Sequence, residues 1–184
     1  MNNLNFNSMV TSEFIVRLKE NSPTIETLTS QFGREVAKTL IEGYHCVLKD
    51  KDYELDKNPL IELFKNYDTR KLQIGLIKLS RQLSFDNNYV RFGNFMEDRL
   101  ALRMHTNEIV TIDLHDPETI LLHCSKDADA FLEIFVLYAK YNTYELTGSR
   151  YTDLDKQEIA QKLLLTAGGE KYKNFVYALL NYSE

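Results

Sequence analysis

The stretch RLALRMHTNEIVTIDL, residues 99–114, decides the predicted fold because its apolar side chains recur at every second position. The apolar residues of each half fall on one face of an extended segment: Leu100, Leu102 and Met104, then Val110, Ile112 and Leu114. The polar residues 105–108 between the two halves are typical of a hairpin connection. The stretch therefore predicts two antiparallel strands.

The flanking segments extend this pair into an antiparallel meander. Residues 89–92 predict a strand before it, and residues 120–124 predict one after the Asp116-Pro117-Glu118 turn. Residues 72–79 are ambiguous, because their apolar positions fit both an alternating strand and one face of a helix. We therefore expect a sheet of four to six strands.

A strongly apolar helix is predicted directly after the meander. Ser125 is expected to cap it, Asp127 and Asp129 lie in its first turn, and it runs to about residue 141. Because its side chains are apolar almost all round, we expect this helix to be central. The expected shared core of helix and meander comprises five residues: Leu102, Val110, Ile112, Phe131 and Phe135.

Helical spacing dominates both ends of the chain. Ser12 is expected to cap a first helix, Ser22-Pro23 to begin the next pattern, and residues 24–49 to form one helix or two joined near Gly33. Asn58-Pro59 predicts a further short helix. At the other end, a helix from Asp153 should stop at Gly168-Gly169, and residues 172–180 predict a last one.

These elements predict an α+β fold with an antiparallel meander of four to six strands packed against several helices. No repeat, low-complexity tract or linker divides the 184 residues. We therefore expect a single domain, residues 1–184, with a helical N-terminal portion of about residues 1–70.

Composition narrows the functional classes. The hydrophobic share of 43 % and the charged share of 27 % indicate a folded chain, and the formal net charge is −5. An acidic chain is repelled by nucleic acid and by anionic membrane surfaces, so neither is an expected partner. The two cysteines lie in apolar surroundings, and there is no signal sequence or span of about 18 apolar residues. A cytoplasmic location is expected.

Catalytic and metal chemistry find little support in the residue pattern. Asp113, His115 and Asp116 could supply two or three metal ligands, but an exposed strand end followed by an Asp-Pro turn explains all three residues without any ligand and is the favoured interpretation. His123 and Cys124 are adjacent on a strand and therefore point to opposite faces. With no phosphate loop, paired-cysteine motif or nucleophile motif, we expect no catalytic residues, no metal and no cofactor.

A helix-turn-helix is the remaining alternative from the N-terminal half. Residues 27–43 carry a similar apolar skeleton with a glycine at Gly33. The apolar residues follow this glycine too soon for a normal turn, and Arg34 and Lys38 are the only basic residues there. DNA binding is therefore a minor alternative.

The order of three segments resembles the SUKH superfamily: YVRFGNF (residues 89–95), RLALRMHTNEIVTIDL (99–114) and ILLHCSKDADAFLEIFVLY (120–138). Phe92-Gly93 is similar to the family's strand end, residues 106–110 to its hairpin with Asn107 at the usual glycine, and residues 125–132 to its capped helix. The likeness covers about residues 89–180, including a closing segment similar to the immunity-protein branch. Residues 1–70 depart from the family pattern.

The resemblance implies a non-enzymatic domain that binds and neutralises a cognate protein toxin, or alternatively a regulatory scaffold of the same fold. An acidic immunity protein suits a basic nuclease toxin through charge complementarity. The acidic loops beside the meander are the expected partner-binding surface: Glu97, Asp98, Asp113, His115, Asp116 and Glu118. An ordinary solvated rim is the alternative interpretation of these residues.

Overall fold

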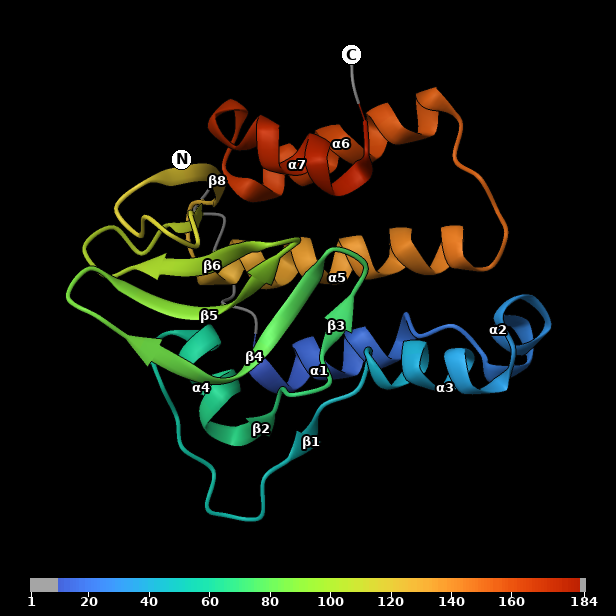
Figure 1. Ribbon diagram of the computed structural model, residues 1–184, viewed down its shortest axis with the longest axis horizontal. Helices are drawn as coiled ribbons and strands as arrows, with labels where there is room; N and C mark the ends of the chain where they lie inside the picture. Colours follow the sequence, from blue (N-terminus) through green and yellow to red (C-terminus); the bar gives the residue numbers. More distant parts are fainter. Residues whose placement is uncertain (1–9, 183–184) are drawn as a thin grey trace, which may run out of the picture.

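The computed structural model describes residues 10–182 and has the expected α+β architecture. Within these residues, six antiparallel strands form one sheet, two short strands form a second, and helices come before and after them. In Figure 1 the sheet occupies one side of the molecule, and the long helix α5 (Ala128–Leu146) lies between the N-terminal and C-terminal helices. The predicted fold class is thus confirmed.

Only some of the four N-terminal helices begin at the residues predicted for them. They are α1 (Thr11–Glu20), α2 (Ile25–Phe32), α3 (Arg34–Glu42) and α4 (Pro59–Asn66). Ser12 does not cap α1, which starts one residue earlier without a side-chain cap. Ser22-Pro23 does not open α2 either, since the hydroxyl of Thr24 caps it by accepting from the Thr27 N–H. Asn58 caps α4 as expected.

Residues 24–49 contain two helices, α2 and α3. The second of them ends at Glu42, well before residue 49. Gly33 separates α2 from α3 with a φ of 79°, a left-handed conformation that favours glycine. After Glu42 the chain turns at Gly43, where an added Cβ would lie 2.2 Å from the carbonyl oxygen of Gln73. The chain then enters β1 (Val47–Leu48), which pairs antiparallel with β2 (Tyr67–Asp68).

The larger sheet is a meander in which every strand pairs with its neighbour in sequence. Its strands are β3 (Gln73–Ile74), β4 (Ile77–Phe85), β5 (Tyr89–Phe95), β6 (Asp98–Arg103), β7 (Ile109–Ile112) and β8 (Ile120–Ser125). The ambiguous residues 72–79 therefore form parts of two strands and the turn between them, and no helix. The register shifts within β4–β5, β5–β6 and β7–β8, and such irregularities increase the local bend and twist of a sheet.

Helix α5 is longer than predicted and has a different cap. The Asp127 carboxylate, not the Ser125 hydroxyl, accepts the N-terminal hydrogen bond, from the Ala130 N–H at 2.8 Å. The helix also continues to Leu146, five residues beyond the expected end, and in this extension the Tyr144 ring packs against that of Tyr151. Helix α6 (Asp153–Ala167) ends at Gly168 as predicted, and a short 3-10 turn leads into α7 (Lys173–Leu180).

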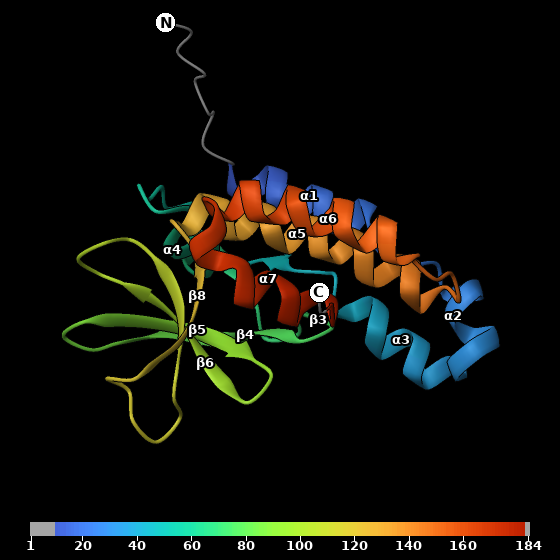
Figure 2. The ribbon, with the colours of Figure 1, turned by 90° about the horizontal axis from the view of Figure 1, so that it is seen from above.

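The main core lies between the sheet and the helices that surround α5. Figure 2 shows α1, α5 and α6 side by side, with α7 between α6 and the sheet. The Phe131 and Phe135 rings of α5 are fully buried there, and the Phe92 ring of β5 lies 5.3 Å from that of Phe131. The prediction of a central apolar helix is therefore confirmed, and Leu102 joins the same core.

Val110 and Ile112 do not belong to this core, although they were predicted to do so. They form a second, smaller cluster with Tyr89 and Ala101, while their neighbour Ile109 joins the main core. Because successive strand residues point to opposite faces, the faces of β7 are the reverse of those expected. Met104 and Leu114, which close the two predicted apolar stripes, are half exposed instead.

Candidate protein-binding site

An acidic cluster gathers at one end of the meander, where the β5–β6 turn meets the β7–β8 connection. Asp98 is the first residue of β6, and the pairing of Arg99 with Ile112 brings it beside Asp113. Burial raises the pKa of the Asp98 carboxyl, and the charges of Asp113 and Glu97 raise it further. The fold thus brings together carboxylates that are fifteen positions apart in the sequence.

The connection between β7 and β8 is held in a defined turn by its own carboxylates. The Asp113 Oδ1 atom accepts hydrogen bonds from the backbone N–H groups of His115, at 2.7 Å, and Asp116, at 2.9 Å. These two bonds lower the pKa of Asp113. Asp116 in turn accepts from the Thr119 hydroxyl at 2.7 Å. Hydrogen bonds from a side-chain oxygen to backbone N–H groups two and three residues later form an Asx turn, which agrees with the interpretation of these residues as a turn.

A metal site does not assemble from these residues. Across residues 10–182, no group of three or more His, Cys, Asp or Glu side chains could hold a metal ion. Asp113 directs one carboxylate oxygen to the backbone, and the side chains of His115 and Asp116 are exposed. The turn therefore accounts for the sequence pattern without a ligand set.

The five carboxylates of the acidic end have no salt bridge within the described part of the chain: Glu97, Asp98, Asp113, Asp116 and Glu118. Two apolar side chains are exposed beside them, Met96 by 62 % and Leu114 by 44 %. We refer to these seven residues as the acidic end. Apolar groups beside unneutralised charge of one sign are features of a surface that a complementary partner covers.

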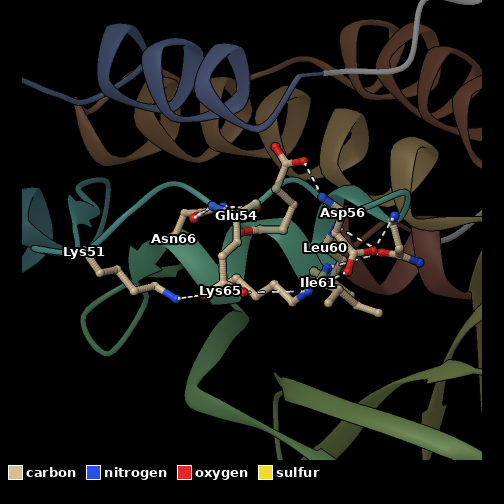
Figure 3. Close-up of polar contacts among 9 residues, drawn as sticks. Lys51, Glu54, Asp56, Leu60, Ile61, Lys65 and Asn66 are labelled. Carbon is tan, nitrogen blue, oxygen red and sulfur yellow. Dashed lines mark hydrogen bonds and ion pairs between the residues drawn. The ribbon is translucent and has the colours of Figure 1, made fainter.

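A second surface feature, which the sequence did not indicate, is the loop of residues 49–58 shown in Figure 3. The Asn66 side chain, 1 % exposed, accepts from the Glu54 N–H at 2.8 Å and donates to the Glu54 carbonyl oxygen at 2.8 Å. The buried Glu62 carboxylate accepts from the Tyr53 hydroxyl at 2.8 Å and from the Asp56 N–H at 3.1 Å. Helix α4 therefore provides the anchors of this loop.

Ion pairs add to this attachment, yet the loop exposes an apolar side chain. Lys51 pairs with Glu54 at 2.5 Å, and Lys65 of α4 pairs with Asp56 at 2.9 Å. Leu55, between the two paired carboxylates, is 82 % exposed. The sequence signal that could have indicated this attachment is a pair of polar residues four positions apart, Glu62 and Asn66, among the apolar residues of α4. Such residues on a buried helix face require partners.

A carboxylate with three ionic partners lies at the opposite end of the sheet from the acidic end. Glu108 is buried, with its side chain 6 % exposed, and it accepts from His123 Nδ1 at 3.0 Å and from Arg103 Nη1 at 3.3 Å. Lys171, before α7, also pairs with it. The carboxylate therefore links β6, β7, β8 and the C-terminal helices. Glu108 lies in the hairpin connection between β6 and β7, as predicted, and it is buried there.

Helices α2 and α3 differ in geometry from a helix-turn-helix. Gly33 alone separates them, whereas the turn of that motif usually has three or four residues. Arg34 and Lys38 are exposed on α3 with no further basic residue on that helix. This arrangement offers few phosphate contacts.

Comparisons of the chain with protein-family models, with curated proteins and with solved structures found no significant match. Among the described residues, no helix has the length and apolar character needed to cross a membrane. The function of this chain is therefore inferred from its own sequence and geometry.

Proposed function

We propose that this protein is a non-enzymatic binding domain that neutralises a basic protein toxin, as immunity proteins do. The observation that carries the proposal is the acidic end, where five carboxylates that form no salt bridge with residues 10–182 lie beside the exposed Met96 and Leu114. The resemblance of residues 89–180 to the SUKH superfamily supports the same function.

The carboxylates of the acidic end repel one another. Burial raises the pKa of Asp98, and the charges of Asp113 and Glu97 raise it further, so bringing these carboxylates together is unfavourable in the free protein. A partner that places lysine or arginine side chains against this surface relieves the repulsion. The acidic end therefore favours a basic partner over a neutral or acidic one.

The apolar side chains of the acidic end affect how tightly this surface holds a partner. Charges at the rim mainly accelerate encounter, whereas buried apolar anchors slow dissociation. Met96 and Leu114 supply apolar contact area at the acidic end, and the ordered turn of residues 113–119 keeps Leu114 in place. The loss of side-chain and loop freedom on binding is correspondingly small.

The test is co-expression with the C-terminal domain of a large toxin encoded beside this gene. The toxin domain alone should arrest growth, whereas the pair should grow and the two proteins should co-purify. Association should slow as salt concentration rises, because exposed charges separated by more than about 8 Å are screened at physiological ionic strength. A purified pair also allows the association rate to be measured directly.

A charge-reversed variant identifies the surface. Glu97→Lys with Glu118→Lys changes the local charge while leaving the hydrogen bonds donated to Asp113 intact. We expect association about tenfold slower at low salt, with unfolding unchanged. The matched control, Glu20→Lys with Glu26→Lys, makes the same charge change at exposed positions of α1 and α2. Its association should slow only as much as the change in net charge requires, and therefore less than that of the acidic-end variant.

Equal slowing in both variants would show that only net charge matters and would move the interface away from the acidic end. Absence of any toxin gene beside this one, or failure of the pair to co-purify at low salt, would exclude the immunity function itself.

A further inference from the structure

A small cavity opens between the two longest helices, on the C-terminal half of α5 and the N-terminal half of α6. Its volume is about 250 Å³, slightly below the range of roughly 300–1,000 Å³ typical of ligand pockets. None of the residues that line it belongs to the acidic end. This size is suitable for a ligand with one ring and a short polar end.

The floor of the cavity is apolar and aromatic. Leu137 and Tyr141 come from α5, and Tyr151 comes from the segment that joins α5 to α6. The rings of Tyr141 and Tyr151 are stacked with centroids 4.9 Å apart and an interplanar angle of 13°. Tyr141 is buried and its ring also lies beside that of Tyr138, whereas Tyr151 is half-buried, so the stacked pair gives the cavity a rigid aromatic wall in which Tyr151 is the more accessible ring.

The rim carries charges of both signs, with a lysine on α5 and two carboxylates and a lysine on α6. Lys140 of α5 lines one side, and Glu158 of α6 lines the other, but no ion pair within 4 Å joins them. Lys162, one turn beyond Glu158, is not paired with it within 4 Å either. Asp155 also lines the cavity, but its carboxylate already accepts from the Thr152 hydroxyl and N–H at the start of α6. Glu158 is therefore the carboxylate that remains available.

We propose that this cavity binds a free aromatic amino acid. Its ring would pack on the tyrosine floor, its carboxylate would face Lys140, and its ammonium group would face Glu158. A zwitterion satisfies both walls at once, whereas a ligand with a single charge leaves one wall without its counterpart. The binding site is separate from the protein-binding surface and does not depend on its assignment.

The first experiment is an NMR titration of the full-length protein, observed through its backbone amide signals, with L-phenylalanine at up to millimolar concentration. Signals of residues in the second half of α5 and the first half of α6 should shift and saturate. Two comparison ligands each lack one charge: 2-phenylethylamine has no carboxylate, and 3-phenylpropionate has no ammonium group. We expect both to bind about tenfold more weakly, the loss associated with one charge-assisted contact.

Two variants test which side chain contacts which charge of the ligand. Lys140→Gln should weaken binding of L-phenylalanine about tenfold and leave binding of 2-phenylethylamine, which has no carboxylate, unchanged. Glu158→Gln should also weaken binding of L-phenylalanine about tenfold but leave binding of 3-phenylpropionate, which has no ammonium group, unchanged. Lys38→Gln, an equally conservative change at an exposed position on α3, should bind all three ligands normally.

Three results would overturn the proposal: no saturable shift with L-phenylalanine, shifts that map outside α5 and α6, or equal affinity for the amino acid and its singly charged analogues. Because all three variants change exposed side chains, their amide spectra should remain those of the folded protein.

Discussion

The hydroxyl oxygen of Tyr138 accepts a hydrogen bond from the backbone N–H of Leu76, with the two atoms 3.1 Å apart. Leu76 lies in the two-residue turn between β3 and β4, so this bond attaches the beginning of the meander to the central helix. Gly75 precedes it with a φ of 52°, and a Cβ added there would lie 2.1 Å from the same hydroxyl.

This relationship predicts that Gly75→Ala destabilises the protein by about 3 kcal/mol, because the substitution adds both backbone strain and a collision. Chemical denaturation measures the change. Gly33→Ala is the matched control, since Gly33 also has a positive φ but no heavy atom within 4 Å of an added Cβ. It should lose only about 1 kcal/mol. Equal losses in the two variants would mean that contact with Tyr138 is unimportant.

Removing the hydroxyl itself tests the other half of the contact. Tyr138→Phe leaves the Leu76 N–H without its partner and should cost about 1–2 kcal/mol. In the double variant with Gly75→Ala, the loss should be smaller than the sum of the two single losses, because the collision is partly relieved. Simple additivity would contradict this prediction.

The core position of α5 predicts a large effect for Phe135→Ala. This ring is fully buried and lies 6.0 Å from the ring of Phe14 and 6.2 Å from that of Phe131. We expect a loss of about 3–5 kcal/mol from the cavity that is created. Val36→Ala, at a half-exposed position of α3, should change stability by less than about 0.5 kcal/mol. An unchanged denaturation midpoint for Phe135→Ala would show that α5 is not central.

The loop of residues 49–58 predicts opposite results for an anchor and for an exposed residue. Asn66→Ala removes hydrogen bonds to the backbone of Glu54 and Glu62, so it should cost about 2 kcal/mol and accelerate amide exchange at Glu54. Leu55→Ser should leave stability and exchange unchanged, since Leu55 is mostly exposed. Hydrogen exchange detected by NMR distinguishes the two. Destabilisation by Leu55→Ser would show that this side chain packs against the protein.

Glu108 predicts a specific dependence of stability on pH. Burial alone would raise the pKa of Glu108, but the contact with Lys171, the charge of His123 and the contact with Arg103 together bring it below its ordinary value. A carboxylate whose pKa is lower in the folded state stabilises the protein above the unfolded-state pKa, about 4.3 for Glu. That contribution is lost as the pH falls from there through the folded-state pKa.

Glu108→Gln should therefore lower stability by about 2 kcal/mol at pH 7, and its stability should fall less than that of the natural protein between about pH 5 and pH 3. Denaturation curves recorded across this range provide the measurement. Glu170→Gln, at an exposed position next to Lys171, is the control and should retain the pH dependence of the natural protein. An identical pH slope in Glu108→Gln and the natural protein would exclude a role for this carboxylate.

Several features of the fold were predictable because their causes are local. The alternation in residues 99–114 indicated two strands, Asn58-Pro59 indicated the start of α4, and Gly168 indicated the end of α6. The acidic end was also partly predictable, since hairpin and turn positions in a meander place residues 97–98 and 113–118 at the same edge. The function inferred from these residues stays a prediction.

The errors concern features for which the sequence offered two equivalent choices. Ser125 and Asp127 are both good caps, and α5 begins where the Asp127 carboxylate reaches the Ala130 N–H. Val110 and Ile109 are both apolar, so residue type could not show which of them faces the helices. A shift of one residue in a strand reverses every face.

Composition and spacing alone thus determined the class of fold, the order of its elements and the acidic character of one end of the sheet, because propensity and periodicity act between residues close in sequence. Only the tertiary structure decided which polar residues are partners. Glu108 is joined to Lys171, and Tyr138 to Leu76, across 63 and 62 positions of the chain, counted as 171 − 108 and 138 − 76. The physical reason is that a buried polar group is stable only when another group satisfies it, and packing of distant elements determines which group that is.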